Sequence, residues 1–148
     1  MSYHHTQIGV VILVICAVIG AVGAAIAWRA APRSMIGMLI ILTTVAVIFN
    51  SLTVEIEGRE LRWYFGPGFW TYRLALEEID SIAVVRNRWW NGFGIRAAPR
   101  FTLYNVSGLG AVELKLKSGE VRRIGTDDPT GLAAALRQAA ERMPYSSR

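Results

Sequence analysis

The feature that most constrains this chain is a long apolar run near its start. Residues 8–28 carry no charged side chain and consist almost wholly of Ile, Val, Leu, Ala and Gly. A helix over this run would be about 30 Å long, which matches the hydrocarbon core of a bilayer. Because each Ile, Val or Leu favours insertion by roughly 0.3–0.6 kcal/mol, the run predicts a first transmembrane helix.

A second apolar run follows a short polar break. Residues 29–34 contain Arg29, Pro32 and Arg33, which end a helix and seat its end at the lipid headgroups. Residues 35–53 then predict a second transmembrane helix, short unless its last residues contribute. The short link would force the two helices into an antiparallel hairpin.

Four small residues recur at three- and four-residue spacing along the first helix. They are Gly20, Gly23, Ala24 and Ala27. Small side chains at this spacing allow another helix to approach closely, so they predict a packing seam. The partner would be either the second helix or another subunit. The alternative is that Gly and Ala are simply common in membrane spans.

Residues 1–7 are expected to form a tail outside the folded part. The tail has no Lys or Arg and a second apolar run follows, which argues against a cleaved signal peptide, although Ala25–Ala27 resembles a cleavage site. His4 and His5 are expected to be solvated rather than to bind a metal. Cys16, the single cysteine, excludes an intrachain disulfide and a Cys-based metal site.

Composition supports this division of the chain. Hydrophobic residues make up 53% of the 148 residues and charged residues 18%, which excludes a disordered protein. All 11 acidic residues lie after residue 54. We therefore expect the polar, folded domain to begin there and to span residues 54–143, with residues 144–148 as a tail.

The periodicity of apolar residues changes to two after residue 54, which predicts β-strands. Gly-containing turns separate the strands. Seven strands are expected, at residues 54–57, 61–65, 71–76, 79–85, 101–106, 112–117 and 121–124. Residues 87–100, rich in Gly and Trp, are expected to form a loop.

The last element is predicted to be an amphipathic helix. Thr126, Asp127 or Asp128 can cap it and Pro129 suits its first turn. One face of the helix is apolar, formed by Leu132, Ala135, Leu136, Ala139 and Met143. The predicted fold class is therefore α+β: a transmembrane hairpin, then a strongly bent antiparallel sheet or small barrel closed by a C-terminal helix.

From about residue 52 to residue 142 the chain resembles the bacterial pleckstrin-homology-like (PH-like) membrane proteins. The most specific stretches are residues 94–96, 104–108 and 124–129. The resemblance implies a seven-stranded bent sheet closed by a C-terminal helix, tethered by membrane spans, facing the cytoplasm and without an enzymatic active site. It does not imply phosphoinositide specificity, because the first hairpin turn offers only Arg59, flanked by Glu57 and Glu60.

Several function classes are disfavoured by what the sequence contains. A nucleophilic triad needs a His base, and the only histidines lie in the expected tail. Zinc sites need His or Cys clusters. Nucleic-acid binding is disfavoured as well, because the sequence has no run of five basic residues, although its net charge is +5. The sequence therefore predicts a non-enzymatic binding or assembly module without a cofactor or bound metal.

One loop combines arginines with aromatic residues and is the predicted contact site. Its members are Arg86, Arg88, Trp89, Trp90, Phe93 and Arg96. Trp and Phe favour the membrane interface, and each Arg is attracted to anionic headgroups by about 1 kcal/mol. The loop would therefore rest on an anionic lipid surface or take a peptide partner. The alternative is that the aromatic rings fold back over the end of the sheet.

Two further features leave alternatives open. Phe69 and Trp70 follow a Gly-Pro-Gly turn and belong either to the core or to an anchor near the membrane. The open edges of a bent sheet also invite pairing between copies of the chain, so a homo-oligomer or a protein partner is an alternative to lipid binding.

The expected location is a bacterial inner membrane, with two spans. Arg29 and Arg33 in the link favour a cytoplasmic link and hence an external domain. Arg59 and Arg62, just beyond the second span, offset this bias. The family resemblance favours a cytoplasmic domain, so we expect the domain to face the cytoplasm.

Overall fold

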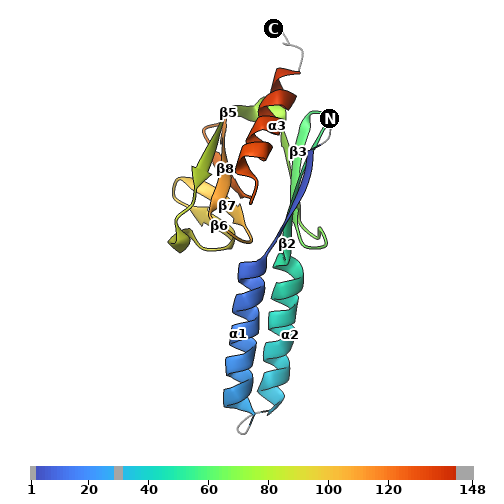
Figure 1. Cartoon of the computed structure of the whole chain (residues 1–148), viewed down its shortest axis with the longest axis vertical. Helices are drawn as coiled ribbons and strands as arrows, with labels where there is room; N and C mark the ends of the chain where they lie inside the picture. The colour runs from blue at the N-terminus through green and yellow to red at the C-terminus, as the bar shows by residue number, and fades with distance from the viewer. Residues whose placement is uncertain (1–2, 29–31, 143–148) are drawn as a thin grey trace.

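The computed structural model describes residues 3–28 and 32–142 and consists of a helical stalk that carries a β-rich head (Figure 1). The stalk is made of α1 (Val10–Ala27) and α2 (Pro32–Phe49), which lie side by side. Within the described residues, only α1 is both long and apolar enough to cross a membrane. The apolar part of α2 is the shorter segment Arg33–Phe49.

The seam between the two helices is built on small residues. A Cβ at Gly20 would lie 3.6 Å from Leu42, and a Cβ at Gly23 would collide with the thioether of Met38. Ala24 and Ala27, which share this face by their spacing, are half-buried. The small residues predicted as a seam therefore lie toward α2 where their contacts are defined.

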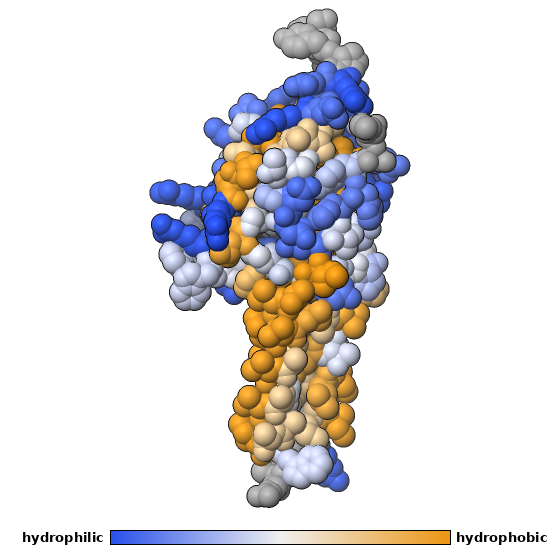
Figure 2. Space-filling view, in the orientation of Figure 1, coloured by the Kyte–Doolittle hydropathy of each residue, from blue (hydrophilic) through white to orange (hydrophobic). Residues whose placement is uncertain are grey.

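The rest of the stalk surface is apolar and exposed, as Figure 2 shows. Thr44 is one of its few polar residues, and its hydroxyl donates to the carbonyl of Ile40 at 2.8 Å. Ile26 and Ile41 are each more than 60% exposed. An exposed apolar surface of this size is unfavourable in water and is rare on soluble monomeric proteins.

The predicted N-terminal tail is wrong, because its described residues, from Tyr3 onward, form a strand. β1 (Tyr3–Ile8) pairs antiparallel with β2 (Ser51–Glu57), with Tyr3 opposite Ile56 and Ile8 opposite Ser51. The sequence of β1 is mostly polar and lacks the alternation of apolar residues that would predict a strand. Its partner lies on the far side of both helices in sequence, so local pattern could not identify the pairing.

The second helix also ends earlier than predicted. α2 stops at Phe49 and β2 starts at Ser51, so residues 51–53 do not extend the helix. Leu52 and Val54 are buried in the head instead of facing outward from the stalk. Residues 29–31 of the expected link lie outside the described residues, and α2 already begins at Pro32.

The head contains two sheets rather than one. The first has the order β1-β2-β3-β4, with β3 (Glu60–Phe65) and β4 (Thr71–Ala75). The second has the order β5-β8-β9-β7-β6 and contains β5 (Ile79–Arg86), β6 (Gly94–Ala98), β7 (Phe101–Asn105), β8 (Gly110–Leu116) and β9 (Val121–Gly125). The described residues thus form nine strands instead of the seven expected, and no closed barrel. The α+β class is confirmed.

Part of the predicted loop at residues 87–100 is a strand. β6 pairs antiparallel with β7, from Gly94 opposite Asn105 to Ala98 opposite Phe101. The Gly-rich composition concealed this strand. Gly94 itself has φ +90°, a conformation that lets the chain turn into the sheet directly after the loop.

The core lies between the two sheets and under α3 (Pro129–Glu141). The predicted alternation is confirmed in β3, where Leu61, Trp63 and Phe65 are buried. The predicted helix cap is confirmed as well, because the Asp128 carboxylate accepts a hydrogen bond from the Gly131 amide at 2.9 Å. The buried face of α3 is formed by Leu132, Ala133 and Leu136. Met143, also predicted for this face, lies outside the described residues.

The strand directions decide which connections lie beside the stalk. β2 leaves the stalk and β3 returns, so the turn at residues 66–70 lies at the stalk end (Figure 1). β5 also runs toward the stalk, which brings residues 87–93 to the same end. The turns at residues 58–59 and 117–119 lie at the far end of the head.

Candidate functional site

The Arg- and Trp-rich loop forms an exposed cluster at the stalk end of the head. A short 3-10 turn, η2 (Trp89–Asn91), carries two indoles that are 74% and 57% exposed at Trp89 and Trp90. Their ring centroids lie 5.7 Å apart, edge to face. The Arg88 guanidinium lies 4.8 Å from the centre of the Trp90 ring, which is a cation–π contact.

Arg96 joins this cluster from β6. Its guanidinium packs over Gly92, where a Cβ would lie 3.0 Å from the Arg96 Nε. Trp90 and Arg96 border a hollow of about 200 Å³. Within the described residues, no carboxylate lies within ion-pair distance of Arg88 or Arg96. Their charges are therefore available to an anion.

The other two predicted contact residues do not join the cluster. Phe93 is half-buried and packs against the hydrophobic core, as the alternative interpretation expected for the aromatic rings. Arg86 is exposed but borders a separate hollow with Val84 and Pro129. Arg86 is the last residue of β5, and the loop begins directly after it.

A second exposed aromatic pair lies at the stalk end, on the turn between β3 and β4. Phe69 is 71% exposed and Trp70 is 54% exposed, so neither belongs to the core. The turn lies against α2: a Cβ on Gly66 would lie 2.5 Å from the carbonyl oxygen of Val47 and 2.6 Å from that of Ile48. The sequence identified this aromatic pair by its position after Gly-Pro-Gly. Its location at the stalk end could be known only from the fold.

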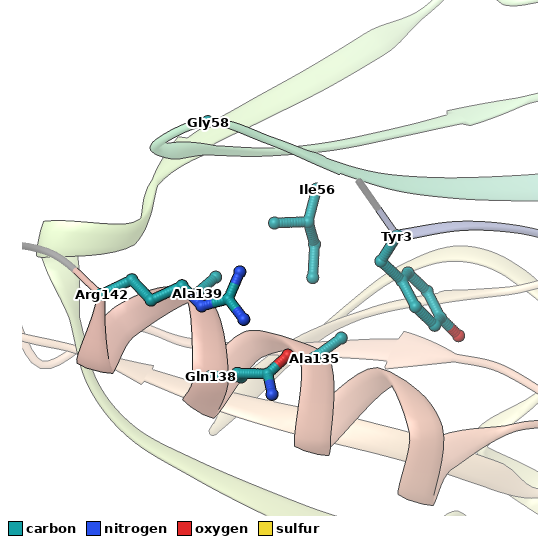
Figure 3. Close-up of a pocket in the computed structure, with 7 residues that line it drawn as sticks. All are labelled: Tyr3, Ile56, Gly58, Ala135, Gln138, Ala139 and Arg142. Carbon is teal, nitrogen blue, oxygen red and sulfur yellow. The ribbon is translucent and has the colours of Figure 1, made fainter. Parts of the chain in front are cut away.

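The head also has a cavity of about 330 Å³ at the end away from the stalk (Figure 3). Ile56 points from β2 toward α3, where Ala135 and Ala139 face it. Tyr3 and Arg142 lie at opposite ends of the cavity. The floor is apolar and the rim polar, so the space suits a small apolar group more than a reaction requiring acid and base.

Both histidines of β1 lie beside carboxylates: His5 is partly buried, whereas the His4 side chain is still 61% exposed, as expected for a solvated residue. His5 Nε2 lies 2.5 Å from the Asp127 carboxylate, and His4 Nε2 lies 3.4 Å from Glu55. Burial, followed by the charges of Asp128 and Asp127, raises the pKa of Tyr3 to about 12. The contact of His5 with Asp127 connects β1 to the segment that caps α3.

The part of the chain that the structure describes contains no candidate metal site. No group of three His, Cys, Asp or Glu side chains there is arranged to hold a metal ion. Cys16 lies half-buried on α1, where it packs against the core cluster.

Comparison with known proteins adds no relative. No protein-family model matches the chain, and no curated protein matches its sequence.

Proposed function

We propose that this chain is a membrane-anchored, non-enzymatic binding or assembly module of a bacterial inner membrane. Both α1 and α2 cross the bilayer, and a PH-like head lies against the cytoplasmic face. The observation that carries the proposal is the pairing of β1, which precedes α1, with β2, which follows α2.

This pairing bears on how many times the chain crosses the membrane. If α1 crossed alone, β1 and β2 would lie on opposite faces of the bilayer and could not share hydrogen bonds. The strands are paired along their length, and Gly9 N donates to the carbonyl of Asn50 at 2.6 Å where the helices meet the head. An even number of crossings satisfies both the strand pairing and the apolar surface of the stalk.

The same pairing favours a retained anchor over a cleaved signal peptide. Cleavage after Ala27 would remove β1 together with α1. The head would then lose the buried side chain of Gln7, whose amide donates to the carbonyl of Ser107 at 2.8 Å. It would also lose the contact of Ile12 with the core.

The distribution of aromatic residues agrees with a spanning stalk. Tryptophan favours the two interfaces of a bilayer. Trp28 is exposed at the far end of α1, and Trp70 and Trp89 are exposed at the head end. The 18 residues of α1 between these ends rise by about 27 Å, close to the thickness of the hydrocarbon core.

The PH-like assignment rests on the resemblance and on the layout of the head. Two antiparallel-rich sheets enclose one core, and α3 packs over the opening between them. The second sheet includes one parallel pair, β7 with β9. Binding or assembly is supported by the outer edge of β6, where Ile95 is 41% exposed on a strand that has a neighbour on one side.

Topology reporters test the anchor. We expect reporters fused before Met1 and after Arg148 to be active in the same compartment, the cytoplasm, in membranes that retain the protein through a carbonate wash. Reporters in opposite compartments would exclude the hairpin. Two external reporters would keep the hairpin and overturn the cytoplasmic assignment.

A second candidate function is that of a reader of anionic lipid surfaces, through residues 86–96. The guanidinium groups of Arg88 and Arg96, which have no carboxylate partner among the described residues and lie beside exposed indoles, favour it. At about 1 kcal/mol for each arginine near an anionic surface, the two contribute about 2 kcal/mol, a preference of roughly thirtyfold for anionic lipid.

A lipid competition experiment tests this candidate. The full chain carries a fluorophore at position 91 (Asn91→Cys in a Cys16→Ala background), in mixed vesicles whose brominated quencher is on either the anionic or the neutral lipid. We expect stronger quenching from the anionic lipid, and loss of that difference in the Arg88→Gln/Arg96→Gln variant. Lys117→Gln, at the far end of the head, is the matched control. Equal quenching by both lipids in the unaltered chain would leave assembly, measured by crosslinking in native membranes, as the favoured function.

A further inference from the structure

We infer that the turn at residues 66–70 is a membrane contact of its own, in which Phe69 and Trp70 insert into the lipid interface beside the end of α2. This interfacial turn would work independently of lipid charge, unlike the Arg-containing loop. The inference rests on the proposed anchoring of the stalk.

The position of the interfacial turn is set by its contacts with α2 and β2. The Gly66 amide donates to the carbonyl of Ser51 at 2.9 Å. Its Cα approaches the carbonyls of Val47 and Ile48 so closely that no side chain fits between them. The turn therefore lies at the level of the last turn of α2, where Val47 is 45% exposed on the apolar stalk surface.

The turn is held in one conformation by its own hydrogen bonds. The Gly68 amide donates to the carbonyl of Phe65 at 3.0 Å, and the Thr71 hydroxyl donates to the carbonyl of Gly68 at 3.3 Å. The ring of Tyr64 lies against Gly68, 3.4 Å from where a Cβ would be. Phe69 and Trp70 are thus exposed on a turn that its own hydrogen bonds support.

The chemistry of the turn indicates that it contacts the bilayer interface. Residues 66–70 contain no charged side chain. Two large exposed rings on a fixed turn are unfavourable in water, whereas Trp combines an apolar ring with one polar N–H and suits the interface. The turn that carries the rings packs against α2 at Val47 and Ile48, and lipid would already cover the exposed apolar surface of that helix. A protein partner would have to displace that lipid.

Together with the Trp89–Trp90 cluster, the interfacial turn gives the head two contacts. The two loops lie at the stalk end of the head, on opposite sides of the stalk in Figure 1. Two contacts beside a helical hairpin would fix the tilt of the head over the membrane. A tethered module held at a fixed tilt presents the same surface to every partner.

Tryptophan fluorescence in the full chain tests the inference. The Trp28→Phe/Trp89→Phe/Trp90→Phe variant retains Trp70 and the buried Trp63, and adding Trp70→Phe provides the blank. Vesicles contain phosphatidylcholine, alone or with phosphatidylglycerol, brominated near the headgroup. We expect a blue-shifted Trp70 emission that is quenched by the brominated lipid in both compositions and shielded from aqueous iodide.

A second variant separates this inference from the proposed anchor. Trp70→Phe/Trp89→Phe/Trp90→Phe keeps Trp28 as the reporter of stalk insertion. If lipid quenches Trp28 while iodide quenches Trp70, the inference fails and the anchor stands. If neither quencher reaches Trp70, a protein surface covers the turn and the inference is also overturned. If lipid quenches neither residue, the anchor itself fails and the inference with it.

Discussion

Replacement of Trp63 by alanine is expected to lower the free energy of unfolding of the head by about 3–5 kcal/mol, which is the usual cost of deleting a buried large aromatic side chain. Trp63 lies on β3 and is fully buried. Because small domains are stable by only about 5–15 kcal/mol, the variant should lose a large share of its stability.

The large effect follows from where the indole lies. Trp63 stacks on Tyr72 of β4, with ring centroids 5.6 Å apart, and meets Tyr104 of β7 edge to face at 5.2 Å. Tyr72 and Tyr104 are themselves 4.8 Å apart. These three rings connect the first sheet to the second, so an alanine at position 63 would leave a cavity at the joint between them.

Two matched variants make the expectation specific. Trp63→Phe should lose much less, because it keeps a ring and because the indole N–H has no hydrogen-bond partner in the described part of the chain. Trp70→Ala, which removes an exposed indole, should cost less than about 0.5 kcal/mol in detergent. Urea unfolding of the full chain in detergent, followed by circular dichroism, provides the measurement. Equal losses for Trp63→Ala and Trp70→Ala would contradict the assigned core.

The second large effect is expected at the contact between head and stalk, from Gly66→Ala. Gly66 has φ +48°, where a non-glycine residue costs roughly 1–2 kcal/mol. The added methyl group would also press on the carbonyls of Val47 and Ile48, which are backbone atoms and cannot rotate away. Overpacking of this kind adds about 1–3 kcal/mol, so the total should reach about 2–5 kcal/mol.

Gly58→Ala is the control that isolates the crowding. Gly58 has a similar φ of +59°, but a Cβ there would meet no atom within 4 Å. Its substitution should cost the conformational term alone. Thermal unfolding of both variants in detergent measures the difference. If the two alanine variants melt at the same temperature, the turn does not press on α2, and the location assigned to Phe69 and Trp70 fails as well.

Local pattern in the sequence predicted several elements correctly, because their causes are local. The absence of charge in residues 8–28 predicted a long apolar helix, observed as α1. Alternation with period two predicted which residues of β3 face the core, since adjacent side chains of a strand point to opposite faces. The Asp128 cap and Pro129 marked the start of α3, because both act within one helical turn.

The candidate site was predicted only in part. The sequence identified an Arg- and Trp-rich loop, but four of its six residues cluster, while Phe93 packs inward and Arg86 borders another hollow. The direction in which a loop side chain points depends on the surface beneath it. Residue type alone could therefore not separate Phe93, beside the core, from Trp89 and Trp90.

What the sequence by itself determined was the division of the chain into an apolar helical part and a polar, β-rich part, because hydropathy and periodicity are properties of neighbouring residues. The tertiary structure alone decided that β1 belongs to the head, that the strands divide into two sheets, and that the turn carrying Phe69 and Trp70 packs against α2 through Gly66. Each of these depends on contacts between segments far apart in the chain. Strand pairing of this kind is set by the packing of the whole core, and short polar strands such as β1 carry no local sign of it.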